Sequence, residues 1–349
     1  MSEITRVGVD LAKNLIQVHA VDAAGRVLVR RAIARRSFID WCVKLPAGCL
    51  VVMEACTGAH HWARRLSQLA LQIRLIAPHL VTPYRLQGKK GKNDANDAAA
   101  VCEAASRPQM HFVPAKTVEQ QAILGVHTLR QGWEKERTAC INRIRALLAE
   151  FGLVFAEGSG KLREQLTQVN EDASNELPAL VRLSIERLQM QWRQLDQDIG
   201  WCDQRIAQHV KQDSRAQQAQ QLLGIGPVGA SALVATVADF GQFKSGAQFA
   251  AWLGLTPSQH SSGGKSRLGG ITKQGDGYLR MLLVQGAKSA IHCSKPRQER
   301  VWLWVQQLSE RIGWQKAAVA LAAKNARILW AMFTRGQPFV ANHVSVKPA

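Results

Sequence analysis

Hydrophobic and polar positions change their spacing along this chain, and the change predicts two different architectures. Before residue 116, short apolar runs are separated by turn residues, which is typical of strands. Strands are expected at Arg6–Val9, Leu15–Val21, Val27–Ala34, Leu50–Met53 and Ile73–Ile76, and helices at Ser37–Leu45, Ala59–Leu71 and Asp94–Ala105. Three strands followed by alternating helices and strands predict an α/β fold with a sheet covered on both faces.

Beyond residue 116 the apolar positions recur at helical spacing. Two long helices, Thr117–Phe151 and Leu177 to about Val210, indicate a coiled-coil arm, and the polar segment Glu157–Ser174 is expected to connect them irregularly or as a hairpin. Later helices are expected at Ala230–Val237, Tyr278–Ala290, Glu299–Ile312 and Gln315–Thr334, with a Gly- and Ser-rich loop at Ser258–Gly277. The pattern therefore predicts three regions, 1–115, 116–215 and 216–340, the last of them mainly helical.

The charge of the chain indicates a polyanionic partner. Its 349 residues carry a formal net charge of +19, and residues 255–349 hold fourteen Lys and Arg against three acids. A further basic loop is expected at Gly88–Lys92. A solvated surface alone rarely needs such a bias, so nucleic acid is the expected partner, and a basic surface serves DNA and RNA alike.

The seven cysteines argue against a zinc ribbon or a disulfide framework. They are scattered singly, and no pair has the CxxC spacing of a metal knuckle. The first residues lack the apolar core of a signal peptide, and no run approaches the roughly 18 apolar residues of a membrane span. A reduced cytoplasmic protein without a membrane partner is therefore expected.

Four acids of the first region stand where carboxylates are expensive to bury. Asp10 follows the apolar run Val7–Val9, Glu54 ends another apolar run, and Asp94 and Asp97 are three residues apart on an expected helix. Singly, Asp94 is a plausible helix N-cap, Asp97 a first-turn acid and Glu54 a cap of the next segment. Together, hard oxygen ligands in basic surroundings favour a site for Mg²⁺ or Mn²⁺, the ions of phosphodiester chemistry.

Three segments that contain these acids carry a family resemblance. Gly8–Lys13 (GVDLAK), Met53–Gly58 (MEACTG) and Lys92–Ala98 (KNDANDA) resemble the DEDD domain of the insertion-sequence-110 transposases, relatives of the Piv-type invertases. The resemblance implies an RNase H-like, RuvC-like mixed-sheet domain in which Asp10, Glu54, Asp94 and Asp97 form the metal-binding catalytic tetrad. Many members have Thr where this chain has Asn93, a position that flanks the ligands.

The segment Leu223–Ala230 (LGIGPVGA) has the Gly-x-Gly pattern of a helix-hairpin-helix. Gly224 and Gly226 would let backbone N–H groups approach a nucleic-acid phosphate at the start of the next helix. A simple tight turn between helices is the alternative for this pattern taken alone.

The order of motifs from Phe249 to Arg280 is similar to the serine transposase domain of the same family. In this chain a Gly-Leu-Thr-Pro motif leads into a Ser-Ser-Gly-Gly-Lys loop. The resemblance implies a serine nucleophile soon after that motif, and matching the Ser-Gly step places it at Ser262, with the neighbouring Ser261 as the alternative. His260 lacks a carboxylate at readable spacing to orient it, so the acidic site is the better activating group. Phosphate contacts are expected at Arg267, Lys273 and Arg280.

The resemblance implies a DNA transposase or recombinase that cleaves and exchanges strands of double-stranded DNA through a phosphoserine link. It further implies guidance by a noncoding bridge RNA, a homodimer or homotetramer with active sites shared between protomers, and action at the bacterial nucleoid. The alternatives are a RuvC-like structure-specific endonuclease that uses water, a site-specific invertase without an RNA guide, and a non-catalytic nucleic-acid-binding protein. A sugar kinase of the actin type is disfavoured, because a second Gly-rich phosphate loop is missing from the sequence.

Overall fold

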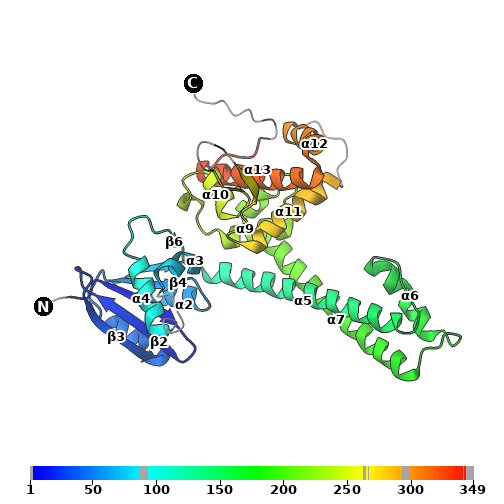
Figure 1. Cartoon of the computed structure of the whole chain (residues 1–349), viewed down its shortest axis with the longest axis horizontal. Helices are drawn as coiled ribbons and strands as arrows, with labels where there is room; N and C mark the ends of the chain where they lie inside the picture. The colour runs from blue at the N-terminus through cyan, green and yellow to red at the C-terminus, as the bar shows by residue number, and fades with distance from the viewer. Residues whose placement is uncertain are drawn as a thin grey trace. The chain divides into compact units, whose positions relative to one another are not determined.

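A computed structural model describes residues 3–85, 93–261, 265, 267–292, 299–340 and 342 (Figure 1). The chain divides into two compact units, Met1–Glu119 and Gln120–Ala349. The division into three regions at residues 115 and 215 stays a prediction. The expected basic loop Gly88–Lys92 lies outside the described residues.

The first unit is built around a six-stranded sheet with the strand order β3-β2-β1-β4-β5-β6. Its elements are β1 (Arg6–Leu11), β2 (Leu15–Val21), β3 (Val27–Ala34), η1 (Arg35–Ser37), α1 (Phe38–Val43), β4 (Leu50–Glu54), α2 (Ala59–Leu66), β5 (Gln72–Ile76), α3 (Pro78–Val81), η2 (Thr82–Tyr84), α4 (Asp94–Ala104) and β6 (Phe112–Val113). The first three strands are antiparallel, β4 and β5 run parallel to β1, and β6 is antiparallel to β5. The sheet is therefore mixed, as the sequence predicts.

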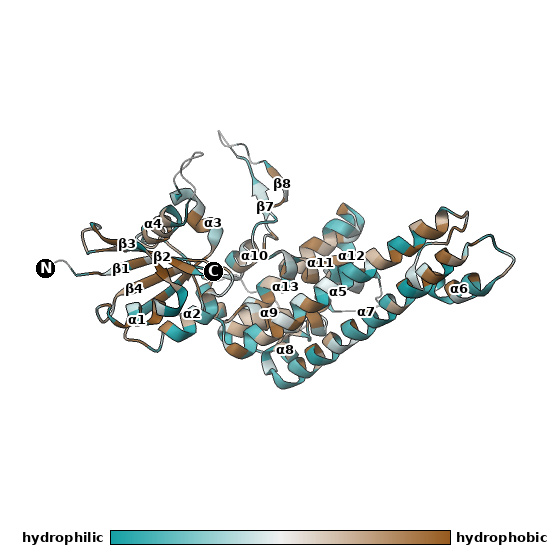
Figure 2. Cartoon of the chain, turned by 90° about the horizontal axis from the view of Figure 1, so that it is seen from below, coloured by the Kyte–Doolittle hydropathy of each residue, from teal (hydrophilic) through white to brown (hydrophobic). Residues whose placement is uncertain are grey.

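Helices cover both faces of this sheet. On one face, Phe38 of α1 and Trp62 of α2 pack over the strands in a single apolar cluster. On the other face, alanines and Val101 of α4 pack with Val52 of β4 and Val81 of α3. Residues of β4 and β5 alternate between the two clusters, which contributes to the hydrophobic colouring of the sheet in Figure 2. The short elements α3, η2 and β6 were not predicted, because so few residues show no periodicity.

The second unit begins with two long helices and continues with shorter ones. Its elements are α5 (Val118–Ala149), α6 (Ser159–Glu171), α7 (Ala179–Gln212), α8 (Ser214–Ala219), α9 (Pro227–Thr236), η3 (Phe240–Gln242), α10 (Gly246–Trp252), β7 (Pro257–Gln259), β8 (Leu268–Ile271), α11 (Gly277–His292), α12 (Arg300–Ile312) and α13 (Trp314–Arg335). α5 and α7 lie side by side and antiparallel (Figure 1), joined by Arg130 with Asp203 and by Arg137 with Asp196. The mainly helical character predicted for this part of the chain is confirmed.

The connection between α5 and α7 differs from the expectation. The segment Glu157–Ser174 was expected to be a hairpin or an irregular connection, but it contains the 13-residue helix α6. Leu162 and Leu166, four residues apart, are buried in one cluster with residues of α5 and α7. Their helical spacing was present in the sequence, but the polar residues around them concealed it, and burial of two leucines stabilises the helix.

A buried polar chain links α5 to the helices that follow it. His127 Nδ1 lies 2.9 Å from the Tyr278 hydroxyl and His127 Nε2 lies 3.0 Å from the hydroxyl of Ser231, which in turn lies 3.0 Å from His209 Nδ1. Burial lowers the pKa of His127 to about 4, so this imidazole is neutral near pH 7. The network ties the two long helices to α9 and α11 through satisfied polar groups. No helix in the described part of the chain is long and apolar enough to cross a membrane.

Candidate metal site and serine hairpin

Asp10 and Glu54 lie at the carboxyl ends of neighbouring parallel strands. β1 pairs with β4 in a register that places Val9 opposite Met53. Asp10 and Glu54 follow one residue later on each strand. Val9 and Met53 point into the core beneath α1 and α2. Strand alternation therefore turns the two acids toward the opposite face, on which α4 lies.

Gly8 allows α4 to approach this face closely. A β-carbon on Gly8 would lie 2.2 Å from the carbonyl oxygen of Ala98 and 2.5 Å from the backbone nitrogen of Cys102. That space holds no side chain, so only glycine permits this contact between β1 and α4. The close contact brings the first turn of α4 to Asp10, a role for Gly8 that the sequence analysis missed.

The first turn of α4 presents Asp94 and Asp97. Asn93 caps the helix, because its side chain accepts a hydrogen bond from the backbone N–H of Asn96 at 2.9 Å. The alternative interpretation of Asp94 as the N-cap is therefore wrong, and its carboxylate is available for other contacts. The Asn96 side chain accepts a hydrogen bond from Arg30 of β3 at 2.8 Å.

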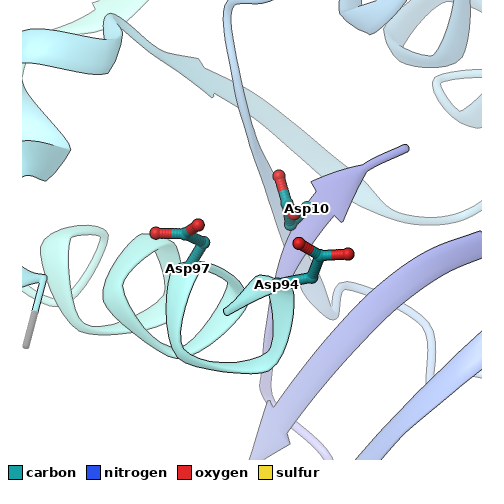
Figure 3. A group of neighbouring side chains, drawn as sticks. All are labelled: Asp10, Asp94 and Asp97. Atoms are coloured by element: carbon teal, nitrogen blue, oxygen red, sulfur yellow. The ribbon is translucent and has the colours of Figure 1, made fainter. Parts of the chain in front are cut away.

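Asp10, Asp94 and Asp97 come together in front of β1 (Figure 3). One carboxylate oxygen from each lies within 4.8 Å of the other two. Burial, together with the charges of the neighbouring acids, raises the pKa of Asp10 from 3.8 to about 6. Negative charges held this close are stabilised by a cation, and hard carboxylate oxygens fit Mg²⁺ or Mn²⁺. These three residues would hold such an ion.

Glu54 is linked to Asp97 of the cluster by Arg85, an arginine that the sequence analysis did not anticipate. Arg85 Nη2 lies 2.6 Å from Glu54 Oε1, and Arg85 Nε lies 3.0 Å from Asp97 Oδ1. Among the described residues, the group of acids with mutually close oxygens comprises three members of the predicted tetrad and leaves out Glu54. Burial raises the pKa of Glu54, and Arg85 acts against that rise. No spacing rule marks Arg85, because it follows η2 in an irregular segment.

The predicted nucleophile Ser262 lies outside the described residues, but the strands that precede and follow it in the sequence are described. β7 and β8 pair antiparallel within the segment that was expected to be only a loop, with Pro257 opposite Ile271. The Ser258 hydroxyl donates a hydrogen bond to the Gly270 carbonyl at 3.1 Å.

Ser261 uses its hydroxyl within the same hairpin. Its oxygen accepts hydrogen bonds from Gln259 Nε2 at 2.9 Å and from the backbone N–H of Arg267 at 3.3 Å. Ser258 and Ser261 therefore both help to build the hairpin. The choice between Ser261 and Ser262 as nucleophile stays a prediction.

Two glycines fix the base of this hairpin by a close crossing of backbones. A β-carbon on Gly254 would lie 2.1 Å from the Gln274 carbonyl oxygen, and one on Gly275 would lie 1.8 Å from the Trp252 carbonyl oxygen. Both glycines also have positive φ, 70° and 93°. The segment around the Gly-Leu-Thr-Pro motif therefore packs, backbone against backbone, on Gln274 and Gly275.

The three expected phosphate contacts differ in their surroundings. Arg267 and Lys273 are exposed, and Lys273 has a positive φ of 55°, which is uncommon for a residue with a side chain. Arg280 is half-buried, and its Nη1 donates hydrogen bonds to the carbonyl oxygens of Leu253 at 3.0 Å and Gln274 at 3.4 Å. Arg280 therefore has a structural role at the hairpin base, beside any role at a phosphate.

Gly224 and Gly226 also differ. Gly224 has φ of +84°, and a β-carbon on it would lie 2.8 Å from the Gly286 carbonyl of α11, so it packs backbone to backbone. Gly226 is exposed at the start of α9, and the space around its α-carbon is open. An open groove of about 470 Å³ follows residues 220–226. Gly226, more than Gly224, is therefore placed where a phosphate would approach backbone N–H groups.

Comparison with known proteins assigns both regions to one class of protein. Residues 216–302 match the model described as "Transposase IS116/IS110/IS902 family", and residues 7–152 match the model of the DEDD transposases of the IS110 type. The matched ranges contain the acidic cluster and the serine hairpin. The class is therefore that of the transposases.

Similar curated proteins cover nearly the whole chain. The "Probable family 20 transposase" of Pseudomonas aeruginosa is 45% identical over 95% of this chain and 97% of its own length. The transposase for insertion sequence element IS1111A of Coxiella burnetii is 39% identical over 97% of this chain and 92% of its own. The transposase for element IS1328 of Yersinia enterocolitica is 38% identical over 97% and 99%. The chain belongs to the IS116/IS110/IS902 family of insertion-sequence transposases.

Proposed function

We propose that this transposase cleaves and rejoins double-stranded DNA at the ends of its insertion sequence by a metal-dependent reaction through a phosphoserine link. The observation that carries the proposal is the convergence of Asp10, Asp94 and Asp97, from a strand end and a helix start, at oxygen separations that suit one hard cation. The strand order β3-β2-β1-β4-β5, with three antiparallel strands and two parallel ones, supports the RNase H-like interpretation of the domain.

The carboxylates and the serine have separate tasks in this proposal. A bound Mg²⁺ or Mn²⁺ would supply Lewis-acid polarisation of a DNA phosphate. Asp10, Asp94 and Asp97 would hold the ion, and Glu54, which is paired with Arg85, would be the fourth member of the tetrad. These acids belong to the first unit and Ser262 to the second, so the two units of one chain, or of two protomers, must meet during the reaction.

Ser262 would attack the phosphorus of a DNA phosphodiester, and the bond from that phosphorus to the oxygen of the departing strand would break. The phosphoserine link conserves the energy of the broken bond. Attack by the hydroxyl of an incoming strand then restores a phosphodiester and releases the serine. Ser262 falls between β7 and β8 in the sequence, and the close backbone crossing at Gly254 and Gly275 would fix the base of that hairpin for the attack.

The partners follow from charge and from the family. Residues 120–212 hold twelve Lys and Arg and twelve Asp and Glu, whereas the rest of the chain carries the whole excess of +19. The basic parts would bind DNA and a noncoding bridge RNA, with Gly226, Arg267 and Lys273 among the contacts of a helix-hairpin-helix and serine domain. The neutral paired helices suit contacts between protomers of a dimer or tetramer in the bacterial cytoplasm.

Excision and circle formation from a plasmid that carries the element in its native flanks would test the proposal. Wild-type protein, Ser262→Ala, Ser261→Ala and Asp10→Asn are compared, and denatured samples are scored for protein covalently attached to DNA. Circles and adducts that disappear in Ser262→Ala and persist in Ser261→Ala support the serine mechanism. Circles and adducts that persist in Ser262→Ala contradict it. The proposed bridge RNA is tested separately, by asking whether RNA transcribed from the element copurifies with the protein.

A second function keeps the same acids but replaces the serine by water. The strand order that supports an RNase H-like domain also suits a RuvC-like structure-specific endonuclease. Cleavage of branched DNA by Ser262→Ala, lost in Asp10→Asn, would favour this function over strand transfer.

A further inference from the structure

Arg85 bridges Glu54 and Asp97 at the acidic site. Its guanidinium contacts Glu54 at 2.6 Å and Asp97 at 3.0 Å, so one cation joins two members of the tetrad. The Glu54 side chain is 12% exposed and that of Asp97 is 20% exposed, so both contacts are shielded from solvent. The Arg85 side chain itself is 37% exposed, so part of it already faces solvent.

The charge of Arg85 supplies what the cluster otherwise lacks. Asp10, Asp94 and Asp97 hold their oxygens within 4.8 Å of one another, an arrangement that repels itself without a cation. Arg30, a described cation on β3, is directed elsewhere and donates to the amide oxygen of Asn96. In the described part of the chain, Arg85 is thus the arginine that forms ion pairs with the acids of the site.

The pairing of Glu54 with Arg85 affects how a metal ion could bind at the site. β1 and β4 bring Glu54 level with Asp10, yet its carboxylate stays outside the close trio and is paired with Arg85. A divalent cation at the trio competes with Arg85 for Asp97 and for Glu54, because both cations are attracted to the same carboxylates.

We propose that Arg85 is an exchangeable counter-charge: it holds Glu54 and Asp97 while the metal is absent, and the metal must displace it before Glu54 becomes the fourth ligand. This inference rests on the proposed metal site. Arg85 is a positioning residue here, since it acts through Glu54 and Asp97. The exchange lowers the affinity for metal and stabilises the metal-free protein.

Mn²⁺ binding to the full-length protein, measured by calorimetry without DNA, tests the exchange. Arg85→Gln is expected to tighten the dissociation constant of Mn²⁺ about threefold to tenfold, because two partly shielded ion pairs no longer compete. It is also expected to lower the Tm in EDTA and to enlarge the rise in Tm caused by Mn²⁺. Arg31→Gln is the matched control, because Arg31 is an exposed arginine on the opposite face of β3 from Arg30.

A folded Arg85→Gln protein that binds Mn²⁺ as wild type does, or more weakly, overturns the exchange. If Arg85→Gln fails to fold, Arg85→Lys replaces it: the charge remains, but a single ammonium bridges two carboxylates less well, so Mn²⁺ affinity again rises. Adding Glu54→Gln to the folded arginine variant must reduce the gain in affinity, because only the release of Asp97 then remains. Wild-type protein that binds no Mn²⁺ contradicts the metal site itself, an outcome distinct from failure of the exchange.

Discussion

The acidic site and the serine hairpin reach their geometry by different means. The acids stand on regular elements: Asp10 and Glu54 near the ends of paired strands, and Asp94 and Asp97 on the first turn of α4. The hairpin is short, and it depends on a crossing of backbones at Gly254 and Gly275 for its position.

This difference indicates which kind of change each region tolerates. In the first unit the register of the sheet sets where the strand acids lie, and the contact of Gly8 with α4 sets how close the helix acids come. In the second unit, local turns and glycines set the hairpin, and hydrogen bonds of Ser258 and Ser261 complete it. A long-range packing error should therefore damage the acidic site, and a local backbone error should damage the hairpin.

The largest expected effects come from removing one proposed catalytic group from each region. Asp10→Asn and Ser262→Ala should each lower circle formation by about three orders of magnitude or more, since each removes a group that acts in the proposed reaction. Only Asp10→Asn should also abolish Mn²⁺ binding, which calorimetry measures. Loss of Mn²⁺ binding in Ser262→Ala would contradict the assignment of separate tasks.

Glycine substitutions at close backbone contacts should affect the acidic site and the serine hairpin differently. Gly8→Ala should destabilise the first unit by about 1–3 kcal/mol and weaken Mn²⁺ binding at least about tenfold, because α4 must move away from β1. Gly254→Ala should leave Mn²⁺ affinity unchanged and remove the covalent adduct with DNA.

Gly125→Ala is the control for both substitutions, since Gly125 lies on α5 with open space around it. Thermal unfolding and Mn²⁺ titration of the three variants measure the contrast. Unchanged Mn²⁺ affinity in Gly8→Ala would show that the approach of α4 does not set the metal site.

A smaller effect concerns pH and belongs to the acidic site alone. The pKa of Asp10 is raised to about 6 in the folded protein, so ionisation between pH 4 and 6 lowers the stability of the metal-free fold. Asp10→Asn should therefore stabilise the protein in EDTA by about 1–3 kcal/mol at pH 7.5, and by less at pH 5. Chemical unfolding at both pH values checks this, and destabilisation at pH 7.5 would be the contrary result.

Protonation of Asp10 should also govern the affinity of the site for metal. Mn²⁺ affinity should fall by up to about tenfold per pH unit below pH 6 and level off above it, since a ligand must lose its proton. Calorimetry from pH 5 to 8 measures this dependence. An affinity that stays constant across pH 6 would mean that Asp10 is not a ligand.

The smallest expected effect compares the basic hairpin with the neutral paired helices. Lys273→Ala should weaken DNA binding a few-fold and reduce the dependence of log affinity on log salt by about one unit, if Lys273 contacts a phosphate. Arg193→Ala removes an exposed charge from α7, in the electrically balanced segment 120–212, and should change neither quantity. Equal effects of the two substitutions, measured by fluorescence anisotropy, would place DNA on the long helices as well.

Much of the fold was predictable because its patterns are local. The five expected strands are present because apolar runs between turn residues are strong indicators, and the long helices α5 and α7 follow from apolar periodicity. Helix α6 was missed, although Leu162 and Leu166 have helical spacing, because burial against two distant helices decides its formation. Asp94 was a reasonable cap on its own, but Asn93 has the required backbone conformation and caps the helix.

The sequence by itself determined the family, the acids and the glycine motifs, because residue type and spacing along the chain carry that information. Only the tertiary structure decided which acids meet. The register of β1 with β4 and the space above Gly8 bring Asp10 to α4, while Glu54 lies outside the trio and pairs with Arg85. These are contacts between segments far apart in sequence, and their distances depend on packing, which no local pattern records.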